Sequence, residues 1–298
     1  MPSLAAHALA LLIRLTGGRR KFARADVTPR EFLGPDPKPA LLPRPLRRRL
    51  DVGQTLQDGH AVYTVMPRGR APSCTVIYFH GGAYAAPITR IHWWFVARLA
   101  ERLGVRVVVP LYPLAPAHTC AETIPFALAL YRNLVAGDPM GRVIVMGDSA
   151  GGGLALALAQ QAVAAGLPAP GGLVLISPWL DVTLSDPEQA AIEPRDVMLM
   201  RPGARAAGRW YAGALPVTDP RVSPLFGSFA GVPPILMFCG GHDILVTDAR
   251  RLAARTGCEV IYHEEPGLMH VYPILSVLPE ARAAQDWIAG FVERVLWD

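Results

Sequence analysis

Ser149 is the residue of this 298-residue chain whose surroundings point most directly to chemistry. It stands in the motif Gly147-Asp148-Ser149-Ala150-Gly151, after an apolar run at 143–146 and before an Ala/Leu-rich stretch. A Gly-x-Ser-x-Gly turn between a strand and a helix holds its serine in a strained, exposed conformation, and only glycines leave room for the backbone on either side. The helix N-terminus that follows favours negative charge. The motif predicts a nucleophilic serine, and a purely structural glycine turn is the alternative.

A serine hydroxyl needs a general base, and the base needs a group that fixes its tautomer. Three histidines follow Ser149 in the sequence: His242, His263 and His270. We expect His270 to be the base, because it follows the turn-like 265–267 stretch after an apolar run and therefore lies on a loop at a strand end. His263 at the strand end favours a sheet-edge or surface role, and His242 favours structural hydrogen bonding.

Asp243 is the predicted acid, because it directly follows the apolar run at 235–239 and two glycines. His270 lies 27 positions after it, which leaves enough chain for one helix and one strand. The alternative role for Asp243 is an N-cap of the next helix. Asp219 and Asp248 are weaker candidates because neither ends a strand.

The stretch His80-Gly81-Gly82-Ala83 is the predicted oxyanion hole. Acyl transfer develops negative charge on the carbonyl oxygen, and each N–H donor aimed there contributes about 3–4 kcal/mol. Small residues after a strand let their amides approach a substrate closely. We therefore expect the hole to be built from Gly81, Gly82 and Ala83 with Ala150, which follows the serine.

Strand-like and helix-like patterns alternate along the chain after residue 75. Strands are predicted at 75–79, 105–109, 142–146, 173–177, 235–239 and 258–262, and helices at 89–103, 121–136, 150–165, 246–256 and 279–296. This alternation predicts the α/β class with a mostly parallel sheet covered by helices on both faces. The 50–66 stretch, with Asp58-Gly59 at its centre, predicts a hairpin that adds antiparallel edge strands.

More than fifty residues separate the predicted strands at 173–177 and 235–239. An insertion of this length is usually functional. We expect it to form a lid over the strand ends, where ligands bind in open α/β sheets. The predicted division is a lid or cap at 1–50, the catalytic domain at 51–180 and 226–298, and the inserted lid at 181–225. The candidate substrate-binding residues are Tyr84, Met198, Trp210 and Tyr211.

The composition is that of an enzyme-sized globule, with 51% hydrophobic residues and a net charge of +5. The arginines near the N-terminus lack the motifs of nucleic-acid readers, so a solvated basic face is expected and no nucleic-acid partner. The four cysteines are scattered, which favours buried thiols and a reducing, cytoplasmic location.

Residues 4–13 form an apolar run that raises the question of a membrane anchor or signal peptide. No basic residue precedes the run, and it is shorter than the roughly 20 residues that a bilayer requires. We therefore expect a lid or docking helix, with contact at a membrane surface as the less favoured alternative.

Taken together, these motifs resemble the hormone-sensitive-lipase-like branch of the α/β-hydrolase fold, which contains bacterial carboxylesterases. The stretches that carry the resemblance are 80–83, 112–116, 147–152, 176–181 and 219–225 with Asp243 and His270. The resemblance implies an α/β-hydrolase fold, hydrolysis of short to medium acyl esters, no cofactor and no metal. It also implies a hole formed by the amides of Gly82, Ala83 and Ala150. Relatives often have a third glycine at position 83, so an alanine there requires a backbone that avoids positive φ.

The sequence thus predicts a serine esterase that acts on a small-molecule ester through an acyl-enzyme. An acyltransferase or amidase with the same triad is one alternative, because the triad does not select the acceptor. A non-catalytic ligand-binding protein is another, although such proteins typically lack the histidine that stands here at 270. Pairing into a homodimer stays open.

Overall fold

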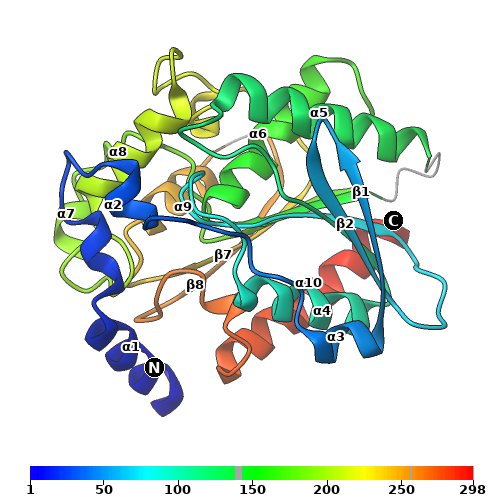
Figure 1. The fold of residues 1–298 in the computed structure, drawn as a ribbon, viewed down its shortest axis with the longest axis horizontal. Coiled ribbons are helices and arrows are strands. Elements are labelled where there is room, and N and C mark those ends of the chain that lie inside the picture. The colour runs from blue at the N-terminus through cyan, green and yellow to red at the C-terminus, as the bar shows by residue number, and fades with distance from the viewer. Residues whose placement is uncertain (138–142, 256, 298) are drawn as a thin grey trace.

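The computed structural model describes residues 1–137, 143–255 and 257–297, and its centre is one eight-stranded sheet (Figure 1). The strand order is β1-β2-β4-β3-β5-β6-β7-β8. The strands are β1 (Leu50–Gln57), β2 (His60–Pro67), β3 (Thr75–Phe79), β4 (Arg106–Pro110), β5 (Val143–Asp148), β6 (Gly172–Ile176), β7 (Ile235–Gly240) and β8 (Val260–Glu265). The first two strands form an antiparallel hairpin at one edge, β2 pairs antiparallel with β4, and the remaining pairs are parallel. The predicted α/β class is confirmed.

Helices cover both faces of this sheet (Figure 1). One face carries α3 (Arg44–Arg49), α4 (Arg90–Leu103) and α10 (Pro279–Trp297), and the other carries α5 (Cys120–Ala136), α6 (Ala150–Ala164) and α9 (Val246–Ala253). Alternate side chains of one strand enter the two cores: Ile77 faces the α5 and α6 side, whereas Val76 and Tyr78 face the α4 and α10 side. The predicted boundaries lie within a few residues of the observed ones. Residue 142, predicted to start a strand, and residue 256, predicted to end a helix, lie outside the described residues.

The first turn of α6 packs unusually close to the sheet. A Cβ atom on Gly151 would lie 2.0 Å from the Phe79 carbonyl oxygen, and one on Gly147 would lie 2.2 Å from the Gly151 carbonyl oxygen. Glycine at both positions therefore allows the helix to begin directly against the ends of β3 and β5. This close approach creates the sharp turn that contains Ser149.

The N-terminal segment and the insertion lie together beside the C-terminal ends of the parallel strands (Figure 1). The first segment contains α1 (Leu4–Thr16), η1 (Gly18–Phe22) and α2 (Pro29–Leu33), and the insertion contains α7 (Gln189–Ile192), α8 (Arg201–Ala212) and η2 (Pro224–Phe226). Their backbones touch, because a Cβ atom on Gly203 would lie 2.4 Å from the Phe22 Cα atom. The stretch before β1 instead runs along the opposite helical layer, where the Ala40 carbonyl accepts from Trp93 Nε1 at 2.6 Å.

Two glycine-to-alanine changes should affect stability in opposite directions. In Gly151→Ala the added methyl group meets backbone, so we expect the free energy of unfolding to fall by about 1–3 kcal/mol. In Gly290→Ala, within α10, the methyl group meets nothing within 4 Å, so we expect a gain of about 0.5–1 kcal/mol from reduced chain entropy and better helix propensity. Urea denaturation followed by circular dichroism measures both. Equal effects at the two positions would contradict the packing described for α6.

Candidate active site

Ser149, His270 and Asp243 lie at the C-terminal edge of the sheet and form one chain of hydrogen bonds. The Ser149 Oγ atom is 2.9 Å from His270 Nε2, and His270 Nδ1 is 2.7 Å from Asp243 Oδ2. All three side chains are buried. The structure therefore brings the three predicted residues together in the arrangement that a serine nucleophile, its base and an orienting acid require.

Ser149 holds a conformation that non-glycine residues rarely adopt, with φ 53° and ψ −121°. Its N–H donates to the Ile176 carbonyl at 2.8 Å, and its own carbonyl accepts from the Trp179 N–H at 2.9 Å. Such strain persists only where the surroundings over-determine the conformation. Hydrogen bonds on both sides of the residue, together with the packing of α6, hold the hydroxyl toward His270.

The acid loop follows β7 and fixes Asp243 through its other oxygen. The Leu245 N–H donates to Asp243 Oδ1 at 2.9 Å, which leaves Oδ2 for the imidazole. Burial alone would lower the pKa of His270, but the charge and hydrogen bond of Asp243, with smaller contributions from Asp196 and Asp148, raise it above its ordinary value of 6.5. The imidazolium form is thus stabilised inside the protein.

The loop that carries His270 is held by a residue for which the sequence analysis predicted no role. Ser177 Oγ accepts from the Val271 N–H at 3.0 Å. Val271 has φ 50°, a strained value for a β-branched residue. Ser177 lies just after β6, within one of the stretches that carry the family resemblance, but its side-chain partner is remote in sequence.

The predicted oxyanion donors divide into two groups. The N–H groups of Gly82, Ala83 and Ala150 donate to no protein acceptor among the described residues, and Gly82 and Ala83 line a pocket together with Ser149. The Gly81 N–H, in contrast, donates to Asp148 Oδ1 at 2.9 Å. The prediction that Gly81 contributes a donor was wrong, because a buried carboxylate already occupies its N–H.

Ala83 departs from a second expectation. The sequence analysis required its backbone to avoid positive φ, whereas φ is 55° at Ala83 and 59° at Tyr84. The left-handed conformation costs an L-residue about 1–2 kcal/mol. Tyr84 is held there by neighbours: its carbonyl accepts from the Ala115 N–H at 2.9 Å, and its ring stacks on Tyr211 at a centroid distance of 3.7 Å. The loop thus keeps its shape without a third glycine.

The buried Asp148 side chain contacts the loop that contains Gly81. Its carboxylate accepts from Tyr78 Oη at 2.5 Å and from the Gly81 N–H, and it lies 3.4 Å from His92 Nε2. Burial would raise the pKa of Asp148, but the interactions with His92, Tyr78 and Gly81 together lower it. An ionised carboxylate at this position ties the loop that contains Gly81 to the turn that contains Ser149. The residue was part of the serine motif, but the sequence offered no sign of its partners.

Asp196 is a further buried acid that sequence reasoning missed. One oxygen accepts from the N–H groups of Met198 and Leu199 at 2.8 and 2.9 Å, and the other accepts from the Ile244 N–H at 3.0 Å. Burial and the charge of Asp243 raise the pKa of Asp196 to about 6. The carboxyl group therefore joins the insertion to the loop of Asp243. No local motif marks it, because its partner Ile244 lies in a different part of the chain.

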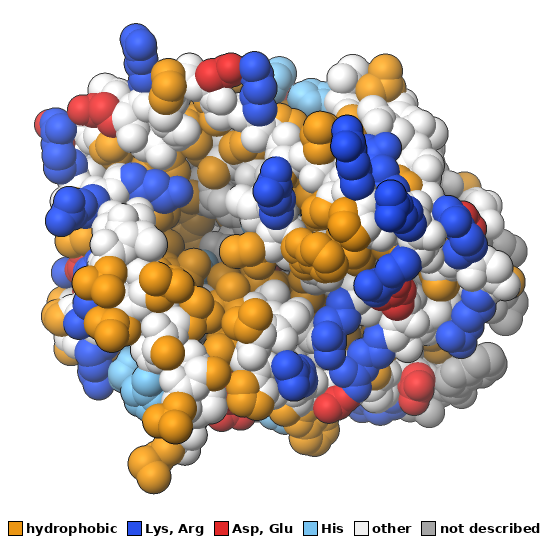
Figure 2. All heavy atoms as spheres, turned by 60° about the horizontal axis from the view of Figure 1, so that its bottom comes forward, with side chains coloured by type: hydrophobic (Ala, Val, Ile, Leu, Met, Phe, Trp, Pro, Cys, Tyr) orange, Lys and Arg blue, Asp and Glu red, His pale blue; other side chains and the backbone are white. Residues whose placement is uncertain are grey.

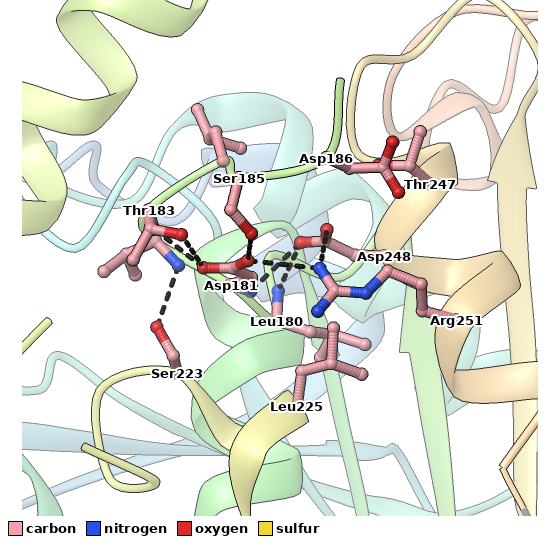
Figure 3. Close-up of polar contacts among 12 residues, drawn as sticks. Leu180, Asp181, Thr183, Ser185, Asp186, Ser223, Leu225, Thr247, Asp248 and Arg251 are labelled. Atoms are coloured by element: carbon pink, nitrogen blue, oxygen red, sulfur yellow. Dashed lines mark hydrogen bonds and ion pairs between the residues drawn. The ribbon is translucent and has the colours of Figure 1, made fainter. Parts of the chain in front are cut away.

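A second polar cluster anchors the start of the insertion, away from the serine (Figure 3). The Asp248 carboxylate accepts from the N–H groups of Leu180 and Asp181, while Asp181 Oδ2 accepts from Arg251 at 3.1 Å. Figure 3 shows the guanidinium directed toward both carboxylates. Burial and the nearby charge of Asp181 raise the pKa of Asp248 well above its ordinary value. Asp248 thus fastens α9 to the end of β6, and the structure does not bring it to Ser149.

The remaining histidine and acid candidates, His263, His242 and Asp219, lie outside the serine cluster. His263 lies in β8 and stacks on Phe238 at a centroid distance of 5.3 Å. Asp219 forms an ion pair with Arg221 at 2.7 Å. His242 is partly exposed, and burial lowers its pKa. None of the three hydrogen-bonds to a member of the serine cluster among the described residues.

The pocket beside Ser149 has a volume of about 330 Å³, within the range of about 300–1,000 Å³ that is common for small-molecule sites. Figure 2 shows a hollow on this face that is lined by hydrophobic side chains and edged by Lys and Arg. Met198, with its neighbours Val197 and Leu199, lines the pocket as the sequence analysis proposed for Met198.

Tyr84, Trp210 and Tyr211 do not line this pocket, so their prediction as substrate contacts is not supported. Tyr84 and Tyr211 are both buried, and their rings stack on each other. Trp210 turns toward the N-terminal segment, where it packs edge-on against Phe32 at 5.6 Å. Side-chain direction on α8 decides this outcome, because residues on one helix face different neighbours.

Across the described residues, no group of His, Cys, Asp and Glu side chains could hold a metal ion. Cys120, Cys239 and Cys258 are free thiols, and Cys239 Sγ lies 3.5 Å from Asp243 Oδ2.

Comparison with known proteins agrees with this geometry. Residues 76–274 match a family model described as the alpha/beta hydrolase fold. The chain is 34% identical over 249 residues to an acetyl-hydrolase of Streptomyces hygroscopicus. The aligned region covers 80% of this chain and 82% of that protein. It is 32% identical over 222 residues to an esterase of Acinetobacter venetianus, with 72% and 73% covered. A crystal structure of an esterase from the bacterial hormone-sensitive lipase family superposes with a TM-score of 0.84 at 25% identity and 99% coverage of each chain.

The fold, the arrangement around Ser149 and these similarities lead to one conclusion. The chain belongs to the alpha/beta hydrolase fold family, in its hormone-sensitive-lipase-like branch, and is a serine hydrolase of carboxylic esters.

Proposed function

We propose that Ser149 is the nucleophile, His270 the general base and acid, and Asp243 the residue that orients the imidazole. Ser149 Oγ attacks the ester carbonyl carbon while His270 Nε2 takes its proton, and the carbonyl oxygen becomes an oxyanion. His270 then gives the proton to the leaving alkoxide, which departs as an alcohol. Water hydrolyses the acyl-enzyme by the same two steps, with His270 again as the base.

The observation that carries this proposal is the continuous contact from Ser149 Oγ through both imidazole nitrogens to Asp243, at 2.9 and 2.7 Å. Asp243 Oδ2 accepts a hydrogen bond from the protonated Nδ1 of His270, so Nε2 presents its lone pair to the hydroxyl. The free N–H groups of Gly82, Ala83 and Ala150 are the donors that we assign to the oxyanion. Donors held by the fold need little reorganisation as the charge develops.

We infer a preference for short to medium acyl chains. The pocket wall beside Ser149 is mainly apolar, and its members include Ala86, Pro87, Leu199 and Ile274. An apolar wall favours hydrocarbon over charged acyl groups. Its modest volume supports substrates of limited length, consistent with relatives named acetyl-hydrolase and esterase.

Replacing the nucleophile tests the mechanism. We expect Ser149→Ala to lower kcat for p-nitrophenyl butyrate by about 10⁶-fold, because the nucleophile is lost. The thermal unfolding midpoint should change by only a few degrees, since the hydroxyl is small and the backbone is kept. Unchanged turnover in purified Ser149→Ala enzyme would remove this mechanism.

The pH profile tests the role of Asp243. Only neutral His270 accepts a proton, so kcat/KM should fall as pH decreases through the His270 pKa, which lies above 6.5. Asp243→Asn removes the main interaction that raises this pKa, so we expect the acidic limb to move to lower pH and kcat to fall by about 10⁴-fold. A limb that keeps its midpoint in Asp243→Asn would show that Asp243 does not act on the imidazole.

Enlarging one side chain in the pocket tests the acyl preference. Met198→Trp should lower kcat/KM for p-nitrophenyl hexanoate at least about tenfold more than for the acetate, because lost chain contacts cost 10–200-fold per group. Trp210→Phe is the matched control, since Trp210 lies on the same insertion but outside the pocket. Its acyl-length profile should stay that of the parent enzyme. A parallel loss for acetate and hexanoate in Met198→Trp would place the acyl chain elsewhere.

A further inference from the structure

We propose that the face carrying α1 binds the surface of an anionic lipid bilayer, with the mouth of the Ser149 pocket turned toward the lipid. The inference goes beyond the ester chemistry, because it assigns a docking surface and its partner. It rests on exposed apolar side chains, on unbalanced positive charge and on the place of the pocket mouth.

The first observation is that α1 presents leucines to solvent. Leu4, Leu11 and Leu15 are 89%, 58% and 75% exposed, and Ala6 is the buried residue of this 13-residue helix. Spacings of seven and four residues place these leucines on one side of a helix. A surface of this kind in a folded protein usually marks an interaction site.

The helix is fixed to the body in a way that keeps these leucines outward. The Ser3 N–H donates to Glu280 Oε1 at 2.6 Å, and Arg14 reaches the Pro194 carbonyl at 3.5 Å. Ile13 faces inward and lines the pocket. The leucines are therefore displayed by a positioned element.

The second observation is the charge of the same segment. Residues 1–24 contain Arg14, Arg19, Arg20, Lys21 and Arg24 and no aspartate or glutamate. Arg24 pairs with Asp26 and Glu31. Among the described residues the other four form no ion pair with a carboxylate. Arg14 and Arg19 donate to backbone carbonyls, the Lys21 amine lies 4.8 Å from the centre of the Phe32 ring, and Arg20 is exposed. Basic groups beside exposed leucines complement anionic headgroups.

The third observation is continuity with the active site. Gly18, Arg19, Lys21 and Phe22 line the same pocket as Ser149. On the α4 side, the pocket-lining Ile91 is 49% exposed. Figure 2 shows hydrophobic side chains around this hollow and few acidic ones beside it. An ester at the lipid surface would thus enter the pocket past the apolar side chains of Ile91 and Phe22, with Arg19 and Lys21 beside them.

The length of α1 favours a helix that lies in the plane of the bilayer surface. Thirteen helical residues span about 20 Å, less than the hydrocarbon core of about 30 Å. No helix among the described residues has the length and apolar character to cross a bilayer. A second copy is a poorer occupant, because a symmetric contact would bring two of these basic segments together.

Vesicle binding by the full chain tests the proposal. Sedimentation should show binding to phosphatidylcholine vesicles that contain 30% phosphatidylglycerol, weak binding to phosphatidylcholine alone, and release in 1 M NaCl, where charge is screened. Removing three leucines in the variant Leu4→Ser/Leu11→Ser/Leu15→Ser should lower the partition coefficient on the order of 100-fold. Arg20→Glu should reduce the preference for anionic vesicles.

The matched control is Leu56→Ser, which removes a 71% exposed leucine from β1, at the hairpin beside α5. We expect it to bind vesicles like the parent protein. All variants should hydrolyse p-nitrophenyl acetate without vesicles at the parent rate, so folding and the ester chemistry are read separately from lipid binding. Equal binding by the triple variant, or equal binding to neutral and anionic vesicles, would overturn the proposal. Sedimentation equilibrium that shows a dimer lost in the triple variant would assign the face to a second copy and also overturn it.

Discussion

The close approach of α6 to the ends of β3 and β5 is the constraint on which the site depends. No side chain fits between Gly151 and the Phe79 carbonyl. Because β5 ends at Asp148 and α6 begins at Ala150, the chain turns within a single residue. That residue is Ser149, whose φ of 53° is stabilised by hydrogen bonds to Ile176 and Trp179. Local strain is thus balanced by packing over two strands and a helix, and its product is a hydroxyl held at a defined point.

Buried carboxylates also hold the segments around Ser149 together. Asp148, Asp196 and Asp243 are all buried, and each carboxylate accepts at least one backbone N–H. Such donors offset the cost of removing an ionised group from water. Asp148 joins the turn of Ser149 to the loop that contains Gly81, and Asp196 joins the insertion to the loop that follows β7. Burial opposes a proton on His270, but the charge and hydrogen bond of Asp243, with smaller contributions from Asp196 and Asp148, outweigh it, which suits the base that we propose for Ser149.

The N-terminal segment and the insertion both contribute residues to the wall of the pocket. The insertion is fastened by Asp181, Asp248 and Arg251 at its base and by Asp196 near Met198. The N-terminal segment is held against α8 at Gly203, and its own residues Ile13 and Phe22 complete the wall. A pocket built from parts so distant in sequence can vary in shape while the groups around Ser149 keep theirs.

The sequence by itself determined the order of the strands and of the helices α4, α5, α6, α9 and α10, the edge hairpin, and the meeting of Ser149, Asp243 and His270. These follow from local patterns and from one general rule, that the C-terminal ends of parallel strands lie on one edge. Only the tertiary structure decided which amides stay free, because the Gly81 N–H donates to the carboxylate of Asp148, which is 67 residues away in the chain. It also decided that Ala83 takes a positive φ, that Tyr84 and Tyr211 stack away from the pocket, and that Asp196 reaches Ile244. Each of these outcomes depends on contacts between residues far apart in the chain, and such contacts leave no periodic or local pattern from which side-chain direction could be read.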